Sequence, residues 1–199
     1  MSSALALTLS RVLLGPVFLI VYLYYQDLGI KLQWLPYALL FLAAISELSD
    51  LFDGRLARRH NKVTDLGKLL DPMADSIFRL SVLLAFTQGL IQLPLLLVCV
   101  FFYRDMIIST LRTLCALRGF ALAARLSGKI KAVIQAVIGF FILILMIPYS
   151  QGCLDLTVLQ EISFYSVSVG AVYTVYSGLE YIYANRKYIK RALGINSTL

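Results

Sequence analysis

Apolar residues along this chain fall into six blocks, each close to the length of about 20 residues that a helix needs to cross a bilayer. The blocks occupy residues 4–26, 32–53, 67–90, 93–117, 130–149 and 159–183. Short polar links separate them, and a chain of 199 residues leaves little for a separate soluble domain. The pattern predicts an all-α integral membrane protein, a six-transmembrane-helix bundle that forms one domain over residues 1–199.

The first block has the length of a secretory signal peptide but not its ends. It lacks a basic start and a small-residue cleavage site, and it finishes in Tyr22, Tyr24 and Tyr25, a residue type that favours the membrane interface. We therefore expect it to be retained as the first transmembrane helix.

The composition agrees with a membrane domain, with 60% hydrophobic residues and a mean hydropathy of +0.82. The net charge is +7, and Lys and Arg collect in the second-to-third link, the fourth-to-fifth link and the C-terminal tail. The positive-inside rule places these segments and both termini in the cytoplasm. We expect a bacterial inner-membrane protein that meets anionic headgroups or phosphate-bearing substrates, and no nucleic acid.

Four aspartates lie near the ends of two apolar blocks, where an uncompensated charge is unfavourable. Asp50 and Asp53 stand at i, i+3 near the end of the second block, and Asp71 and Asp75 at i, i+4 near the start of the third. On helices each pair shares one face. Two such faces turned toward each other make an all-oxygen site for two divalent cations, Mg²⁺ or Mn²⁺, that clamp phosphate oxygens. The alternative is that the aspartates only solvate a cytoplasmic loop.

Small residues and an arginine surround the aspartates. Gly54, Ala57 and Gly67 remove bulk where a ligand or helix must come close, and Arg58 can hold a diphosphate with two hydrogen bonds. The complete order is D-x-x-D-G-x-x-A-R, eight residues, G-x-x-x-D-x-x-x-D. Its eight fixed positions match a given start by chance with a probability on the order of 10⁻¹⁰. The order resembles the signature of the CDP-alcohol phosphotransferases, which join a CDP-activated group to an alcohol and release CMP.

The resemblance implies a membrane enzyme with a cytoplasmic-facing active site, CDP-diacylglycerol as its substrate, and a homodimeric assembly. It implies that two divalent cations are held by Asp50, Asp53, Asp71 and Asp75. It implies a nucleotide site made by Asp50, Gly54, Ala57, Arg58, Thr64 and Gly67. Asp75 would also take the proton of the attacking hydroxyl, and His60 is the alternative base.

A second basic cluster follows in the fourth and fifth blocks. Arg104 and Arg112 stand at i, i+8 on one helical face, and Lys129 and Lys131 open the fifth block. The four side chains can hold a phosphate, although the two lysines can also be ordinary topology-setting charges. They lie in a longer set that resembles the phosphatidylglycerophosphate-forming branch of the family, whose acceptor is sn-glycerol 3-phosphate. The other members of this set are Asp105, Ser109, Leu111, Gly128 and Gln135.

Four residues depart from the pattern of that branch, namely Glu47, Ser76, Arg79 and Ala132. Because they lie close to where the acceptor should bind, the same transfer to inositol phosphate or to serine stays open. Outside the enzymes, a six-helix transporter is the alternative, since transporters also hold carboxylates within the membrane.

Two of these departures are expected to meet. Glu47 lies one turn deeper than Asp50, and Arg79 one turn deeper than Asp75. If the two helices pack antiparallel through their aspartate faces, Glu47 and Arg79 form a buried ion pair that holds the helices in register. The alternative is that Arg79 reaches a substrate phosphate or steers Asp75.

Overall fold

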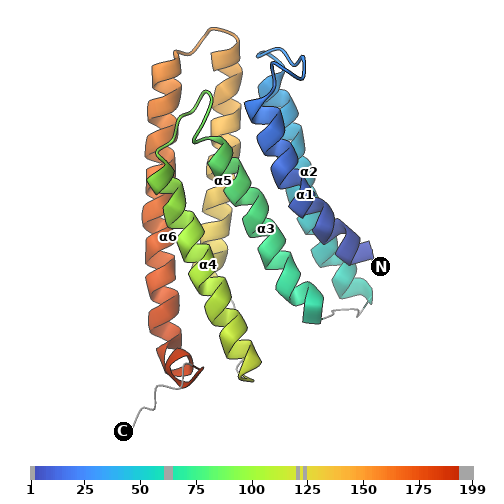
Figure 1. The fold of residues 1–199 in the computed structure, drawn as a ribbon, viewed down its shortest axis with the longest axis vertical. Helices are drawn as coiled ribbons and strands as arrows, with labels where there is room; N and C mark the ends of the chain where they lie inside the picture. Colours follow the sequence, from blue (N-terminus) through green and yellow to red (C-terminus); the bar gives the residue numbers. More distant parts are fainter. Residues whose placement is uncertain (1–2, 61–64, 120–121, 123–124, 193–199) are drawn as a thin grey trace.

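Six helices in succession form the described part of the molecule (Figure 1). They are α1 (Ser3–Leu23), α2 (Leu35–His60), α3 (Asp65–Ala85), α4 (Leu95–Leu117), α5 (Leu126–Ser150) and α6 (Leu156–Ala192). The computed structural model describes the backbone of residues 3–60, 65–119, 122 and 125–192, and the side chains of residues 12–49, 73–119, 122 and 125–192. Every regular element in these ranges is an α-helix, which confirms the all-α prediction.

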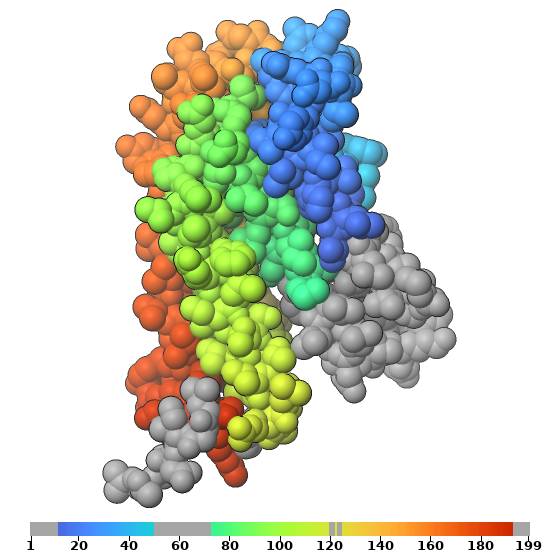
Figure 2. All heavy atoms as spheres, in the orientation of Figure 1, coloured from blue at the N-terminus to red at the C-terminus, as the bar shows by residue number. Residues whose placement is uncertain are grey.

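Consecutive helices run in opposite directions, so the links alternate between the two ends of the bundle (Figure 1). The links α1–α2, α3–α4 and α5–α6 share one end, and the C-terminal end of α6 lies at the other. Helix α3 packs mainly against α1 and also contacts α4 and α5, while α6 packs against α4 and α5. Figure 2 shows the face that α1, α3, α4 and α6 form together. Helix α2 lies behind it and packs mainly against α1 and α5.

Aromatic side chains fill the core between α1 and α3. The ring of Phe18 meets that of Phe78 edge to face, with 6.0 Å between centroids, and both residues are buried. Gly15 lets the two helices approach closely, because a Cβ atom there would lie 2.7 Å from the Ser81 hydroxyl. The tight α1–α3 contact fixes the position of the helix that carries Asp75.

Tyr22 joins this core instead of the membrane interface, where the sequence predicted it. Its side chain is buried, and its hydroxyl accepts hydrogen bonds from the backbone N–H groups of Leu90 and Ile91 at 3.2 Å each. The hydroxyl also donates to the Gln88 carbonyl. The α3–α4 link therefore satisfies the polar end of Tyr22, which removes the need to reach water.

One helix in the described parts of the chain, α5, is both long and apolar enough to cross a membrane. Shorter apolar segments occur in α1 (Val12–Leu23) and α2 (Leu35–Ser49). Helix α4 is long and apolar too, but it carries Arg104, Asp105 and Arg112. The structure is therefore consistent with a membrane protein. The six predicted transmembrane spans stay a prediction.

Three helices extend further than the apolar blocks predict. Helix α2 continues to His60, through half of the segment that we expected to be a polar link; α5 begins at Leu126; and α6 continues to Ala192. Apolar blocks mark the part of a helix that meets lipid or core, whereas Leu, Ala, Arg and Lys keep a helix intact beyond it. Asp50 and Asp53 thus share one helix, and Asp71 and Asp75 share another, as predicted.

Candidate functional site

The acidic pairs lie on the backbones of α2 and α3, but most of their side chains lie outside the described set. The predicted metal ligands Asp50, Asp53 and Asp71 belong to that group. So do the predicted nucleotide contacts Gly54, Ala57, Arg58, Thr64 and Gly67. Of the four aspartates in the two acidic pairs, Asp75 is the one whose side chain is described, and this side chain is partly buried. The roles of these residues stay predictions.

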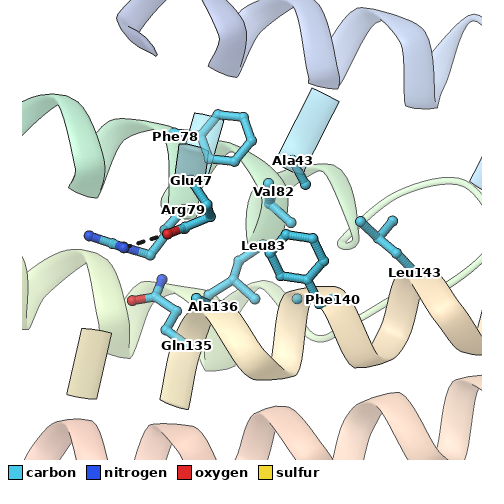
Figure 3. A pocket seen from close by; sticks show the side chains of 11 residues that line it. Ala43, Glu47, Phe78, Arg79, Val82, Leu83, Gln135, Ala136, Phe140 and Leu143 are labelled. Carbon is cyan, nitrogen blue, oxygen red and sulfur yellow. Dashed lines mark ion pairs between the residues drawn. The ribbon is translucent and has the colours of Figure 1, made fainter. Parts of the chain in front are cut away.

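Arg79 lies between two carboxylates. Its Nη1 atom is 3.6 Å from Glu47 Oε1 on α2, and its Nη2 atom is 3.6 Å from Asp75 Oδ2, one turn away on α3. The Glu47 to Arg79 ion pair is therefore confirmed (Figure 3), although one third of the Glu47 side chain is exposed. Arg79 also contacts Asp75, so the two contacts that we treated as alternatives are both present, and the roles of Arg79 stay predictions.

Helices α2 and α3 run antiparallel, as expected, and the long Arg79 side chain reaches Glu47 on α2. Among the described residues, α2 packs mainly on α1 and α5. Most of the aspartate faces lie outside the described side chains, so their packing against each other stays a prediction. A groove opens beside the ion pair. Its volume is about 760 Å³, and its polar end is formed by Glu47, Asp75, Arg79 and Lys129.

The rest of the groove is apolar and follows one face of α5. Val133, Val137, Phe141 and Ile144 line it at intervals of three and four residues, and all four are exposed. A polar end beside Asp75 and an apolar track along a helix suit a molecule with a charged head and hydrocarbon tails.

The predicted acceptor-phosphate residues divide into two groups. Lys129 is exposed and lines the groove, close to Asp75 and Arg79. Lys131 is buried, and its Nζ atom donates to both carboxylate oxygens of Asp105, at 2.9 and 2.8 Å. Arg104 shares the same carboxylate, with Nη1 3.1 Å from Oδ1.

Arg104 is held where three helices meet. A Cβ atom at Gly128 of α5 would lie 3.4 Å from Arg104 Nη2, and one at Gly178 of α6 would lie 3.1 Å from Arg104 Cγ. The two glycines thus leave the space that this arginine occupies. Its Nε atom is buried and has no hydrogen-bond partner among the residues that the structure describes. Arg112, two turns further along α4, is partly buried. The structure does not test whether these residues bind a phosphate.

Two polar residues at the site received no role from the sequence. Glu180 of α6 accepts a hydrogen bond from the Ser127 hydroxyl at 2.6 Å and pairs with Arg125 Nε at 2.6 Å, which ties α6 to the start of α5. Gln135 is buried one turn beyond Lys131. Both stand alone as polar residues in apolar stretches, and that isolation is the sequence signal that indicates a buried partner.

The donor set fits a divalent cation by its chemistry. Asp50, Asp53, Asp71 and Asp75 offer only carboxylate oxygens, the hard ligands that Mg²⁺ and Mn²⁺ prefer. Among the side chains that the structure describes, no three acidic, His or Cys residues gather into a metal-binding group. Three of the four aspartates lie outside that search, so it leaves the cation site a prediction.

Comparison with known proteins extends over nearly the whole chain. A protein of Bacillus subtilis (strain 168) is 31% identical over 92% of this chain and 95% of its own length. A protein of Rickettsia felis is 30% identical over 92% of this chain and 94% of its own length. A protein of Escherichia coli (strain K12) is 33% identical over 66% of this chain and 70% of its own length. All three are named CDP-diacylglycerol–glycerol-3-phosphate 3-phosphatidyltransferase. The family model for CDP-alcohol phosphatidyltransferases matches residues 1–176, and the chain belongs to this family.

Proposed function

We propose that this protein transfers the phosphatidyl group of CDP-diacylglycerol to sn-glycerol 3-phosphate, giving phosphatidylglycerophosphate and CMP. The observation that carries the proposal is the similarity to relatives named for this reaction over nine tenths of the chain. Family membership favours a transferase over the six-helix transporter.

In this proposal Asp50, Asp53, Asp71 and Asp75 hold two divalent cations, Mg²⁺ or Mn²⁺, at the ends of α2 and α3. When bound, the cations neutralise the diphosphate and stabilise the departing CMP. The nucleotide lies against Asp50 and the small residues Gly54, Ala57 and Gly67. Arg58 and Thr64 add hydrogen bonds to it.

Asp75 accepts the proton of the acceptor hydroxyl as the oxygen attacks the phosphorus of the phosphatidyl group. The new P–O bond forms to the acceptor, and the bond between this phosphorus and the oxygen of CMP breaks. A metal-held carboxylate is a weak base, so its alignment matters more than its basicity. The contact of Arg79 with Asp75 at 3.6 Å restricts where the carboxylate can turn.

Lys129 is the best placed of the four proposed acceptor-phosphate residues, because it lines the groove beside Asp75. Arg104, Arg112 and Lys131 complete the proposed phosphate site. Arg104 and Lys131 already share Asp105, so they act mainly by their charge, which makes this end of the groove attractive to a dianion.

The lipid tails of CDP-diacylglycerol lie along the apolar track of the groove, on the exposed face of α5, which we expect to meet the bilayer. The proposal includes six transmembrane spans, an inner-membrane location and cytoplasmic termini. It also includes assembly as a homodimer. The alternation of links in Figure 1 supports it, since the basic C-terminal end of α6 lies at the end opposite to the α1–α2, α3–α4 and α5–α6 links.

The acceptor is tested by supplying purified protein and CDP-diacylglycerol with radiolabelled glycerol 3-phosphate, inositol phosphate or serine in separate reactions. We expect lipid-soluble label from glycerol 3-phosphate alone, together with CMP, and no product after a chelator removes divalent cations. Label from inositol phosphate or serine in place of glycerol 3-phosphate would reassign the acceptor, and Ala132, which lines the groove, would be the first residue to examine.

A further inference from the structure

Helix α5 begins with positive charge and without an acidic residue of its own. Arg125 is its N-cap residue and makes no capping hydrogen bond through its side chain, and the first turn contains Lys129 but no aspartate or glutamate. The N-terminal end of a helix carries a partial positive charge and backbone N–H groups that lack a partner within the helix. Cations are therefore unfavourable here, and the start of α5 needs an anion from another part of the chain.

Glu180 of α6 supplies this anion. One of its carboxylate oxygens, Oε1, lies 2.6 Å from Arg125 Nε, and the other, Oε2, accepts the hydrogen bond of the Ser127 hydroxyl at 2.6 Å. Only 24% of the Glu180 side chain is exposed, so solvent and salt screen the contact less than they screen a surface ion pair. The first residues of α5 thus engage both oxygens of a carboxylate on another helix.

Close packing at two glycines brings the helices together beside this contact. Gly178 of α6 and Gly128 of α5 both lie against Arg104 of α4. A Cβ atom would lie 3.1 Å from Arg104 Cγ at Gly178, and 3.4 Å from Arg104 Nη2 at Gly128. The start of α5 is therefore held on two sides, by the packing of Gly128 on α4 and by the Glu180 carboxylate on α6.

A backbone hydrogen bond connects the Glu180 contact to the groove. The N–H group of Lys129 donates to the Arg125 carbonyl at 3.3 Å, so one helical turn joins the residue that pairs with Glu180 to Lys129. Lys129 lines the groove together with Asp75. The ends of a helix fray when nothing holds them. Loss of the Glu180 carboxylate would therefore loosen the turn that sets the place of Lys129 in the groove.

We propose that Glu180 is a positioning residue that holds the first turn of α5, so that the Lys129 ammonium group faces the acceptor phosphate. The hold on the turn follows from the contacts of Glu180, whereas its effect on the acceptor rests on the proposed function. Glu180 lies beyond residue 176, the last residue that the family model matches. The aspartate signature therefore does not account for this carboxylate.

Glu180→Gln tests the proposal, because it keeps an oxygen that can accept from Ser127 but removes the charge that pairs with Arg125. We expect KM for glycerol 3-phosphate to rise about fivefold, the factor that corresponds to the loss of one helix-capping interaction. The values of kcat and of KM for CDP-diacylglycerol should not change, because only binding of the acceptor is weakened. Glu161→Gln, at an exposed position near the start of α6, is the matched control and should change none of the three constants. An unchanged KM for glycerol 3-phosphate in Glu180→Gln, or a fall in kcat without a change in this KM, would overturn the proposal.

A double-mutant cycle separates positioning from a general loss of stability. In a Lys129→Ala background, Glu180→Gln should raise KM for glycerol 3-phosphate no further, because the residue through which it acts is gone. Independent, multiplying increases in KM would contradict the proposal. If Glu180→Gln does not fold, Ser127→Ala is the milder change: it removes one hydrogen bond to Glu180 and should raise the same KM about threefold, and no rise would contradict the proposal as well.

A spin label measures the hold on the turn without turnover. In a chain that lacks the three native cysteines, a label at Leu126→Cys, exposed in the first turn of α5, should become more mobile when Glu180→Gln is added. A label at Gln151→Cys, exposed at the other end of α5, should keep its mobility. Equal mobility of the Leu126→Cys label with and without Glu180→Gln would show that Glu180 does not hold the turn. This measurement decides the hold even if the wild type transfers nothing to glycerol 3-phosphate, an outcome that would refute the proposed function instead.

Discussion

Arg79 shows how single residues balance charge at this site. It faces Glu47 on α2 and Asp75 on its own helix, so one cation lies between two anions. The sequence predicted the first contact from depth alone, because each residue lies one turn inside an aspartate. It could not predict that both contacts occur at once, since that depends on the distance between α2 and α3.

The most direct test at this scale is Asp75→Asn. The amide keeps the shape of the carboxylate but cannot accept the proton, so we expect kcat for CMP release to fall by about 10²–10⁴-fold. Binding of CDP should be largely retained, which separates loss of the base from loss of the fold. Asp155→Asn, at an exposed position at the start of α6, is the control. Wild-type turnover by Asp75→Asn would remove the assignment.

Asp105→Asn tests the buried cluster. Asp105 pairs with both Lys131 and Arg104, and the exposed fractions of the Lys131 and Asp105 side chains are only 5% and 9%. Removing the anion leaves two buried cations beside each other, and breaking such a pair typically costs about 3–5 kcal/mol. We expect a clearly lower midpoint of thermal unfolding in detergent.

The double variant Asp105→Asn with Lys131→Met should recover part of that loss, because it removes one of the two uncompensated charges. Equal stability of Asp105→Asn and wild type would show that the cluster is hydrated and not structural.

At the scale of the elements, apolar blocks located all six helices but not their ends. The predicted polar link after Asp53 is helical as far as His60, and α6 runs well past the apolar block that ends at residue 183. Hydropathy reports where a helix meets an apolar environment, whereas the ends depend on propensity and on neighbouring helices. The hydrogen-bond partners of buried polar side chains were equally hard to predict. Tyr22 and Glu180 each form a hydrogen bond with a segment that is distant in the sequence.

Tyr22→Phe tests how α1 holds the α3–α4 link. The change removes the hydroxyl that accepts from Leu90 and Ile91 and leaves two backbone N–H groups without this acceptor. A loss of about 1–3 kcal/mol in the free energy of unfolding is expected. Tyr24→Phe, at an exposed position, is the control and should change nothing. Thermal unfolding of both variants checks the prediction, and equal midpoints would mean that water replaces the hydroxyl without loss.

The whole molecule is organised by the alternation of its links. The α5–α6 link and the α2–α3 segment belong to opposite ends of an antiparallel succession, and the sequence assigns the basic end to the cytoplasm. The number of helices and the alternation of their links could be predicted, because both follow from the order of charged and apolar residues in the sequence. The groove could not be predicted, because it depends on how side chains from α2, α3 and α5 are placed relative to one another in space.

Cysteine labelling in intact cells tests the orientation. Cys153 is exposed in the α5–α6 link, while Cys99 and Cys115 can be replaced by alanine to leave a single target. An impermeant maleimide added from outside the inner membrane should label Cys153. In a chain that lacks all three native cysteines, Arg118→Cys, at an exposed position at the C-terminal end of α4, should be labelled only after the membrane is opened. Labelling of both from the same side would contradict the proposed topology.

The central claim is that the acidic faces of α2 and α3 together hold two divalent cations. Electron paramagnetic resonance of Mn²⁺ titrated into the protein with CDP measures this directly, because free and bound Mn²⁺ give different signals. We expect two bound ions per chain, with binding strongly weakened in Asp53→Asn on α2 and in Asp71→Asn on α3. Binding that is absent in the wild type, or unchanged in variants of either helix, would contradict it.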